Sequence, residues 1–185
     1  IARLLAQYDV KVVINSVTSV EKGNAIAKEL IGSIYCQANI ANEMDCKNLI
    51  DTTINKYGRL DFLINNAGAK GRLPTSDINA ITNELFSETL NTNVVGTWCL
   101  TRYAIPHLKK SGDGVIINIT SCAGSDPAAV SSAMPYAASK AAINYLTRIL
   151  AKELGPEIRV NAIAPGLIVT PRTEGFTVAI EKFEN

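Results

Sequence analysis

Histidine, clustered cysteine and an excess of charge of either sign are what this 185-residue sequence lacks. The four cysteines are scattered without CxxC spacing, and His107 is the only histidine. Zinc and iron–sulfur sites need several such ligands at close spacing, so we expect no metal site. The formal net charge is +1, without a basic or acidic block, which argues against nucleic acid or a membrane surface as partner.

Long apolar runs are also missing. No stretch approaches the roughly 20 apolar residues that a transmembrane helix needs. The opening residues, IARLLAQYDV, lack the basic lead and the small-residue cleavage site of a signal peptide. Scattered cysteines that behave as small buried apolar side chains suit a reducing compartment. These absences predict a cytoplasmic protein.

Apolar residues are plentiful enough for one substantial core, at 47% of the chain. At this length we expect one domain over residues 1–185 rather than two. Strand-like apolar or β-branched stretches stand at 10–14, 33–40, 60–65, 114–119 and 158–163. Helical patterns stand at 21–30, 42–58, 79–110 and 135–154. This alternation of strands and helices predicts an α/β fold with a doubly wound parallel sheet.

The segments that follow the predicted strands are mostly small, polar or turn-forming. They are Asn15-Ser16-Val17, Asn39-Ile40, Asn66-Ala67-Gly68, Thr120-Ser121 and Ala164-Pro165-Gly166. Doubly wound sheets bind ligands in the crevice beyond the carboxyl ends of their strands. We therefore expect these segments to line one crevice.

Tyr136 and Lys140 are candidates for chemistry because they stand four residues apart in a predicted helix, which places both on one face. A fixed ammonium favours the ionised phenol and lowers the tyrosine pKa toward the range of a proton donor or acceptor. Such a pair also arises by chance, so its context has to decide. Ser121 closes a strand, where its hydroxyl could donate a hydrogen bond to a substrate oxygen that gains negative charge.

Two glycine-containing stretches could contact a ligand. The NNAG stretch at 65–68 predicts a turn that a ligand approaches closely. After the last predicted strand, a rigid turn and an apolar segment could hold a flat ring and its amide. That segment contains Pro165, Gly166, Ile168 and Thr170. Taken alone, each stretch also fits an ordinary turn.

Taken in order, these stretches resemble the short-chain dehydrogenase/reductase family, and in particular its 3-oxoacyl-carrier-protein reductases. The matching motifs are NNAG at 65, NTNVVGTW at 91, GVIINITSCAG at 114, YAASK at 136 and RVNAIAPGLIVT at 159. The likeness extends from residue 1 to about residue 172. It implies a Rossmann-type sheet and an enzyme that moves hydride between a nicotinamide cofactor and a small carbonyl or secondary alcohol substrate.

The resemblance also implies roles for the candidate residues. Tyr136 would be the acid or base for the substrate oxygen, Lys140 would hold the nicotinamide ribose, and Ser121 would orient the substrate. Asn93 would help to carry protons from Lys140 toward solvent through water. The other cofactor contacts would come from Ser16, Asn39 and Ile40 on the adenosine side, from Asn66, Ala67 and Gly68, and from Pro165, Gly166, Ile168 and Thr170 around the nicotinamide.

Some family features are absent from the sequence. The glycine-rich phosphate loop and the first strand would precede Ile1, and a last strand would follow Asn185. The resemblance therefore implies truncation at both ends and a sheet without its first and C-terminal strands. No aspartate ends the second family strand, at Asn15-Ser16-Val17-Thr18-Ser19, where it would grip both ribose hydroxyls of NAD. The expected cofactor is NADP, with NAD as the alternative.

Two further questions concern assembly and turnover. The predicted helices at 79–110 and 135–154 resemble those that meet in family oligomers, so we expect a homodimer or homotetramer. An alternative function also stays open, that of a catalytically silent relative that senses the cofactor or serves as a scaffold. The absent phosphate loop favours it, whereas the presence of Ser121, Tyr136 and Lys140 argues against it.

Overall fold

Parallel strands and helices alternate along the chain in the computed structural model, which describes residues 1–69, 78–126, 134–166 and 168. The strands are β1 (Val13–Ser16), β2 (Ile34–Gln37), β3 (Phe62–Asn65), β4 (Gly114–Ile119) and β5 (Ile158–Ile163). The helices are α1 (Ala2–Ala6), α2 (Val20–Glu29), α3 (Glu43–Tyr57), α4 (Asn83–Leu90), α5 (Gly96–Ser111) and α6 (Met134–Leu154). Short 3-10 turns occupy Ile78–Ala80 and Cys122–Gly124, and a π-helical turn, Asn91–Val95, joins α4 to α5. The predicted α/β fold is confirmed.

Two predicted boundaries were wrong. The strand expected at 10–14 is β1 at Val13–Ser16, because its ladder begins only where Val13 lies opposite Ile34 of β2. Val10 still belongs to the turn that follows α1, where its N–H donates to the Leu5 carbonyl. The helix expected over 79–110 is divided by the π-helical turn.

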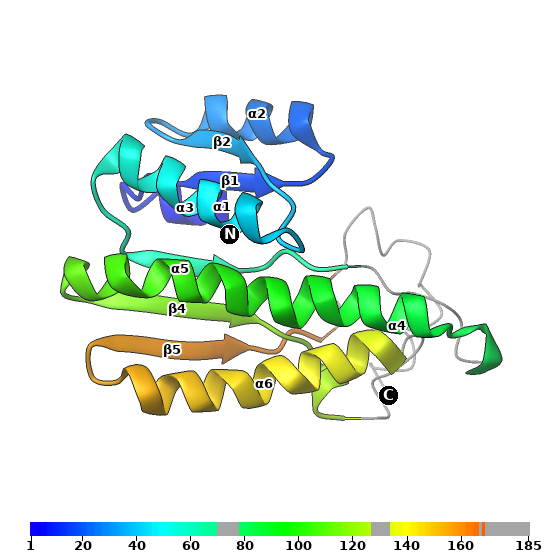
Figure 1. Ribbon diagram of the computed structural model, residues 1–185. Coiled ribbons are helices and arrows are strands. Elements are labelled where there is room, and N and C mark those ends of the chain that lie inside the picture. Colours follow the sequence, from blue (N-terminus) through cyan, green and yellow to red (C-terminus); the bar gives the residue numbers. More distant parts are fainter. Residues whose placement is uncertain (70–77, 127–133, 167, 169–185) are drawn as a thin grey trace.

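The strands form two hydrogen-bonded sheets rather than one. β1 pairs with β2, and β3, β4 and β5 pair in that order, all in parallel. Figure 1 shows β1 facing β3 across the space between the sheets, and no ladder joins these strands in the described residues. The family's first strand would stand at this central position. The predicted Rossmann-type arrangement of parallel strands flanked by helices is confirmed. The expected place of the C-terminal strand lies outside the described residues.

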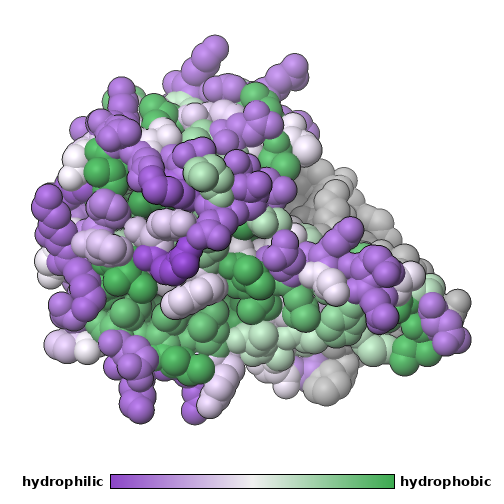
Figure 2. Space-filling model, in the orientation of Figure 1, coloured by the Kyte–Doolittle hydropathy of each residue, from purple (hydrophilic) through white to green (hydrophobic). Residues whose placement is uncertain are grey.

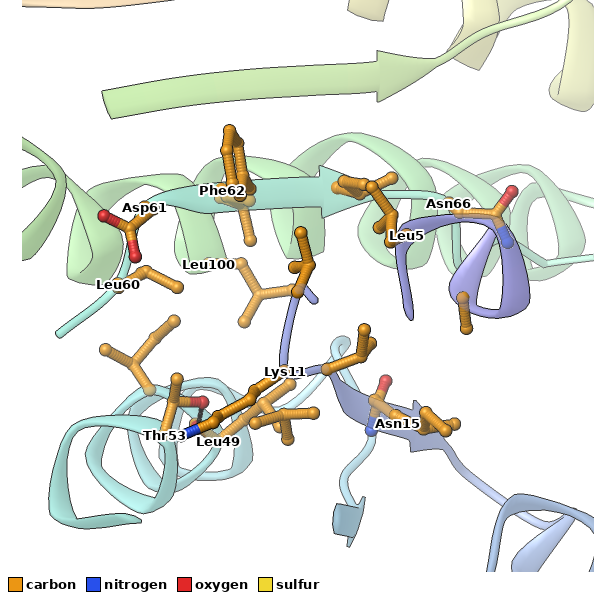
Figure 3. Close-up of a pocket in the computed structure, with 18 of the residues that line it drawn as sticks. Leu5, Lys11, Asn15, Leu49, Thr53, Leu60, Asp61, Phe62, Asn66 and Leu100 are labelled. Atoms are coloured by element: carbon orange, nitrogen blue, oxygen red, sulfur yellow. Dashed lines mark hydrogen bonds between the residues drawn. The ribbon is translucent and has the colours of Figure 1, made fainter. Parts of the chain in front are cut away.

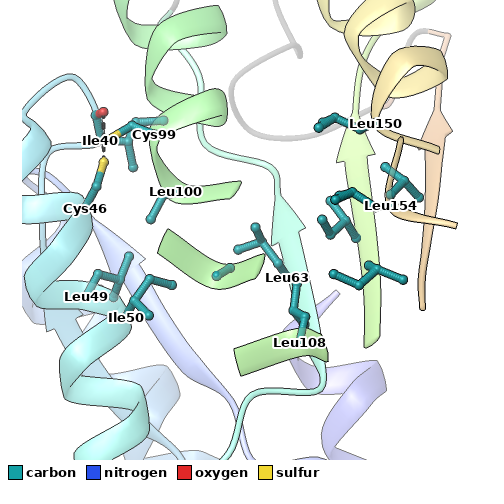
Figure 4. Packing of buried hydrophobic residues seen from close by; sticks show 14 of the residues in the cluster. Ile40, Cys46, Leu49, Ile50, Leu63, Cys99, Leu100, Leu108, Leu150 and Leu154 are labelled. Atoms are coloured by element: carbon teal, nitrogen blue, oxygen red, sulfur yellow. Dashed lines mark hydrogen bonds between the residues drawn. The ribbon is translucent and has the colours of Figure 1, made fainter. Parts of the chain in front are cut away.

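One apolar core connects the two sheets through α3 and α5, which pack against each other. On α3 the buried side chains follow helical spacing, at Cys46, Leu49, Ile50 and Thr53. Of these, Cys46, Leu49 and Ile50 belong to the same apolar cluster as Leu100 of α5 (Figure 4). α5 packs on β3 and β4, and α6 packs on β5 (Figure 1). Lys140 and Thr147 of α6 are hydrogen-bonded to Ile119 and Asn118 at the end of β4.

A cavity of about 770 Å³ occupies the space between β1 and β3. Figure 3 shows its apolar walls, with Leu5, Leu49 and Phe62 among the labelled side chains. The Asn65 Oδ1 atom at its edge is buried without a hydrogen-bond partner in the described part of the chain. Neither Tyr136 nor any other predicted catalytic residue lines this space, so it is an interruption in the sheet rather than the place where Tyr136 would act.

Candidate active site

Tyr136 and Lys140 lie together near the start of α6, as their spacing predicts. The Lys140 Nζ atom lies over the Tyr136 ring, 5.5 Å from its centre. A cation at this distance from an aromatic face is attracted to the ring. The two side chains therefore face the same space rather than opposite sides of the helix.

The Lys140 ammonium is buried, with the residue 5% exposed. Its Nζ donates a hydrogen bond of 2.7 Å to the Ile119 carbonyl at the end of β4. Burial lowers the pKa of Lys140 from 10.5 to about 8, because a surrounding of low polarity disfavours the charged form. An ammonium has three hydrogens, and in the described residues only Ile119 accepts one of them. The others can serve oxygen atoms of a ligand.

Ser121 reaches the same place from the end of β4. Its Oγ accepts a hydrogen bond of 3.3 Å from the Ala123 N–H and so begins the short turn Cys122–Gly124. That turn lies directly on α6, since a Cβ on Gly124 would come within 2.7 Å of the Lys140 carbonyl carbon. Asn144 of α6 holds the other end of the turn, where its Nδ2 donates to Ser125 Oγ at 3.1 Å. Only glycine permits this close approach.

Asn93 connects the segment after β3 with α6. Its side chain is fully buried, and Oδ1 accepts from the Ala69 N–H at 2.7 Å. Its Nδ2 donates to Ser139 Oγ at 2.9 Å, and that hydroxyl donates to the Tyr136 carbonyl at 2.6 Å. A continuous chain of hydrogen bonds therefore fixes the first turn of α6. The role of Asn93 in proton transfer stays a prediction.

Sequence reasoning missed two residues of this arrangement, Ser139 and Gly124. Ser139 was counted only as one small residue within YAASK, and Gly124 only as part of GVIINITSCAG. Nothing in the local pattern shows that Ser139 meets Asn93, which lies in a different helix. The sequence signal for both residues is their small size within motifs that resemble the family.

Two predicted cofactor segments lie beside this group. At Gly68 a Cβ would stand 3.9 Å from Lys140 Nζ and 3.2 Å from Asn93 Oδ1, so the exposed backbone of 66–68 passes close to the ammonium. The Cys122 N–H donates to the Pro165 carbonyl at 3.0 Å, which holds 165–166 next to the Ser121 turn. Ile168 is exposed, and Thr170 lies outside the described residues.

The predicted adenosine-side residues belong to the β1–β2 sheet. Ser16 ends β1, and its Oγ lies 2.9 Å from the Tyr35 hydroxyl. Asn39 is exposed, and its Oδ1 accepts from the Ala41 N–H at 3.0 Å. Ile40 is buried in the core, and the start of α5 lies against its carbonyl. These residues thus lie at the end of the β1–β2 sheet, whereas Tyr136 lies on α6, which packs on β5 of the other sheet.

The described residues contain neither a candidate metal site nor a membrane-spanning helix. No group of three histidine, cysteine, aspartate or glutamate side chains there could hold a metal ion. No described helix combines the length and apolar content needed to cross a bilayer. All four cysteines are free thiols, and burial raises the pKa of Cys46 to about 12. A thiol with that pKa does not act as a nucleophile near neutral pH.

Known proteins resemble this chain in sequence and in fold. The family model described as short chain dehydrogenase matches residues 1–179. The chain belongs to the short chain dehydrogenase family. A crystal structure of a family member from Burkholderia xenovorans, titled a short-chain dehydrogenase/reductase, matches with a TM-score of 0.85 and 30% identity, over 93% of this chain and 73% of that one. The resemblance expected from the motifs is confirmed.

Two curated family members indicate the range of named activities. A Streptomyces violaceoruber protein designated ketoacyl reductase 2 of granaticin polyketide synthase is 46% identical over 174 residues, which are 94% of this chain and 69% of that protein. The L-fucose dehydrogenase of Bos taurus is 38% identical over 154 residues, which are 83% of this chain and 55% of that enzyme. The chain thus spans about half the length of the L-fucose dehydrogenase it matches.

Proposed function

We propose that the whole protein is an NAD(P)-dependent oxidoreductase that interconverts a carbonyl group and a secondary alcohol on a small molecule. The observation that carries the proposal is the Lys140 ammonium, which lies over the Tyr136 ring and donates to the Ile119 carbonyl at the end of β4, two residues before Ser121. An oxidoreductase of this kind needs a proton donor or acceptor for the substrate oxygen, and a hydroxyl donor to stabilise it. We propose further that residues 1–185 act together as one catalytic domain.

In this proposal Tyr136 gives its proton to the carbonyl oxygen during reduction and takes a proton from the alcohol during oxidation. Lys140 Nζ lies over the Tyr136 ring, where it would hold the nicotinamide ribose beside the phenol. Ser121 Oγ already accepts from the protein, so its hydrogen is available for the substrate oxygen. The nicotinamide cofactor supplies or accepts the hydride when bound.

The residues present suit such a cofactor. The unused hydrogens of Lys140 match ribose hydroxyls as acceptors, and the exposed backbone at Gly68 passes close to this ammonium. The remaining contacts are proposed for Ser16, Asn39, Ile40, Asn66, Ala67, Pro165, Gly166, Ile168 and Thr170. No carboxylate ends β1 to oppose a 2′-phosphate, so we propose NADP(H) as cofactor, with NAD(H) as the alternative.

We also propose a homodimer or homotetramer and a cytoplasmic location. Five large apolar side chains are exposed on the described parts of the π-helical turn, α5 and α6: Val95, Trp98, Met134, Tyr145 and Ile149. Figure 2 shows hydrophobic residues gathered over the α5 and α6 part of the surface. Exposed apolar groups of this extent suit a contact with a second copy. Sedimentation of the protein as a monomer only, at micromolar concentration, contradicts this assembly. The free thiols suit the reducing cytoplasm.

Kinetics and cofactor binding of the full-length protein test the proposed function. Ketones and alcohols are screened with NADPH and NADH, and Tyr136→Phe is compared with Tyr145→Phe, an exposed tyrosine on the same helix. Tyr136→Phe is expected to lose about 10²- to 10⁴-fold in kcat while cofactor still binds, and Tyr145→Phe is expected to keep its activity. Cofactor binding without turnover of any substrate would identify the silent relative instead. Full activity in Tyr136→Phe excludes the proposed role of the phenol.

A further inference from the structure

Two side chains of β2 hold the end of β1. Tyr35 and Gln37 stand two residues apart and so lie on the same face of β2. The Tyr35 hydroxyl lies 2.9 Å from Ser16 Oγ and donates to the Ser16 carbonyl at 3.1 Å. Gln37 Nε2 donates to the Val17 carbonyl at 2.7 Å. The turn after β1 is therefore fixed by the neighbouring strand.

The Tyr35 ring packs directly against Gly23 of α2. A Cβ on Gly23 would stand 2.3 Å from two carbons of the ring, a distance at which no side chain fits. Gly23 is buried in the middle of α2, where glycine costs about 1 kcal/mol relative to alanine in helix formation. Glycine at this position leaves room for the Tyr35 ring. The packing of the ring against α2 in turn fixes the position of the Tyr35 hydroxyl.

Two arrangements of hydrogen atoms satisfy this pair of hydroxyls. In the first, Tyr35 donates to the Ser16 carbonyl, Ser16 donates to the Tyr35 oxygen, and Ser16 Oγ faces outward as an acceptor. In the second, Tyr35 donates to Ser16 Oγ, and the Ser16 hydrogen is available outward. The Ser16 carbonyl keeps the Ala38 N–H as a donor at 3.3 Å in both. Changing between them therefore leaves no backbone group unpaired.

The charged residues around this turn favour neither an anionic nor a cationic ligand. The segment Asn15-Ser16-Val17-Thr18-Ser19 contains no charged side chain, and Glu21 and Lys22 at the start of α2 carry opposite charges. A ribose 2′-hydroxyl can donate or accept a hydrogen bond, and no charged group in this segment repels it. A 2′-phosphate accepts only, and meets neither a carboxylate nor an arginine in this segment.

We propose that Tyr35 is a positioning residue that lets Ser16 meet the ribose 2′-hydroxyl of NAD(H) as an acceptor and the 2′-phosphate of NADP(H) as a donor. The protein then binds both cofactors, and the Tyr35 hydroxyl sets the ratio of their affinities. This inference rests on the proposed function, since it requires a nicotinamide cofactor whose adenosine ribose lies at the end of β1.

Removing the Tyr35 hydroxyl affects the two cofactors differently. In Tyr35→Phe the ring can still pack against Gly23, but the Ser16 hydroxyl hydrogen loses the Tyr35 oxygen as its acceptor. The hydrogen then points outward. There it can still donate to the 2′-hydroxyl of NADH, but it donates more strongly to the charged oxygens of the 2′-phosphate of NADPH. One lost hydrogen bond corresponds to about a 3- to 10-fold rise in the ratio of the NADH to the NADPH dissociation constant.

Equilibrium binding of NADH and NADPH, followed by cofactor fluorescence on the full-length protein, tests this. Tyr57→Phe is the matched control, because Tyr57 donates to the Gly32 carbonyl at 2.6 Å, away from Ser16. We expect Tyr35→Phe to raise the ratio and Tyr57→Phe to leave it unchanged. In a Ser16→Ala background, Tyr35→Phe should no longer change the ratio, which separates the effect on Ser16 from a general loosening of β2.

The possible outcomes separate this inference from the proposed function. An unchanged ratio in Tyr35→Phe, a shift toward NADH, or the same shift in the Ser16→Ala background overturns the inference while the oxidoreductase proposal stands. A wild-type protein that binds only one of the two cofactors also overturns it. Binding of neither cofactor overturns both, and binding of both without turnover overturns the oxidoreductase proposal alone.

Discussion

Replacing Lys140 by methionine should make the protein inactive and more stable. The side chain is 5% exposed, and burial lowers its pKa from 10.5 to about 8. The unfolded chain therefore binds the proton more tightly than the folded chain does. Below about pH 8 the folded state must hold an unfavourable buried charge, and methionine of similar length removes it.

The size of the effect follows from the pKa values. The pKa of Lys140 is about 2.5 lower in the folded chain than in the unfolded chain. This difference corresponds to about 3 kcal/mol less stability of the folded state below pH 8. The Lys140→Met variant leaves the Ile119 carbonyl without its donor, which costs about 1 kcal/mol. The variant should thus gain about 2 kcal/mol at pH 7, or about 4–8 °C in Tm for a chain of this size.

The pH dependence has a definite sign. Because the folded pKa is depressed, the penalty is fully present below about pH 8 and disappears as pH rises to about 10.5. Wild-type stability relative to Lys140→Met should therefore increase across this window. The gain of the variant should disappear before pH 10.5 is reached, where only the loss of about 1 kcal/mol from the unpaired Ile119 carbonyl remains.

Urea unfolding at pH 7 and at pH 10, at constant ionic strength, measures both effects. Lys47→Met serves as the control, because Lys47 is exposed and pairs with Asp51 on the surface of α3. Its stability change should stay below about 1 kcal/mol. A Lys140→Met variant that is less stable than wild type at pH 7, or whose gain does not change between the two pH values, refutes the reasoning.

Two other substitutions test the support of the site. Ser139→Ala leaves the buried Asn93 Nδ2 without an acceptor, so we expect a loss of about 1–3 kcal/mol in urea unfolding and a lower kcat, because the first turn of α6 at Tyr136 is released. An unchanged kcat with the expected loss of stability would assign Ser139 to folding alone. Gly124→Ala places a Cβ within 2.7 Å of the Lys140 backbone, so we expect about 1–3 kcal/mol of destabilisation and a higher KM for substrate, measured by steady-state kinetics; a KM equal to that of wild type contradicts this.

Local features of the chain were predicted well where the cause is local. The helix expected at 42–58 is α3 at Glu43–Tyr57, because Asn42 caps its first turn through the Asp45 N–H and Gly58 ends it with a φ of 72°. The strand expected at 158–163 is β5. Tyr136 and Lys140 face each other because a separation of four residues places both on one side of any helix.

Contacts between distant segments could not be predicted in this way. The bond from Asn93 to Ser139 joins the π-helical turn to α6, and the contact of Gly124 with Lys140 joins the end of β4 to α6. Tyr35 looks like an ordinary strand tyrosine until β2 pairs with β1 and brings its hydroxyl to Ser16. None of these contacts has a spacing that marks it in the sequence.

The sequence by itself thus determined the type and order of the elements, the fold class and the chemical groups of the candidate site. Those depend on hydrophobic period, capping residues and side-chain type, which act over a few neighbouring residues. Only the tertiary structure decided which hydrogen bonds hold these groups, how deeply Lys140 is buried, and where the sheet is interrupted between β1 and β3. These properties depend on packing between segments that are far apart in the chain, where burial and the loss of water set the energies.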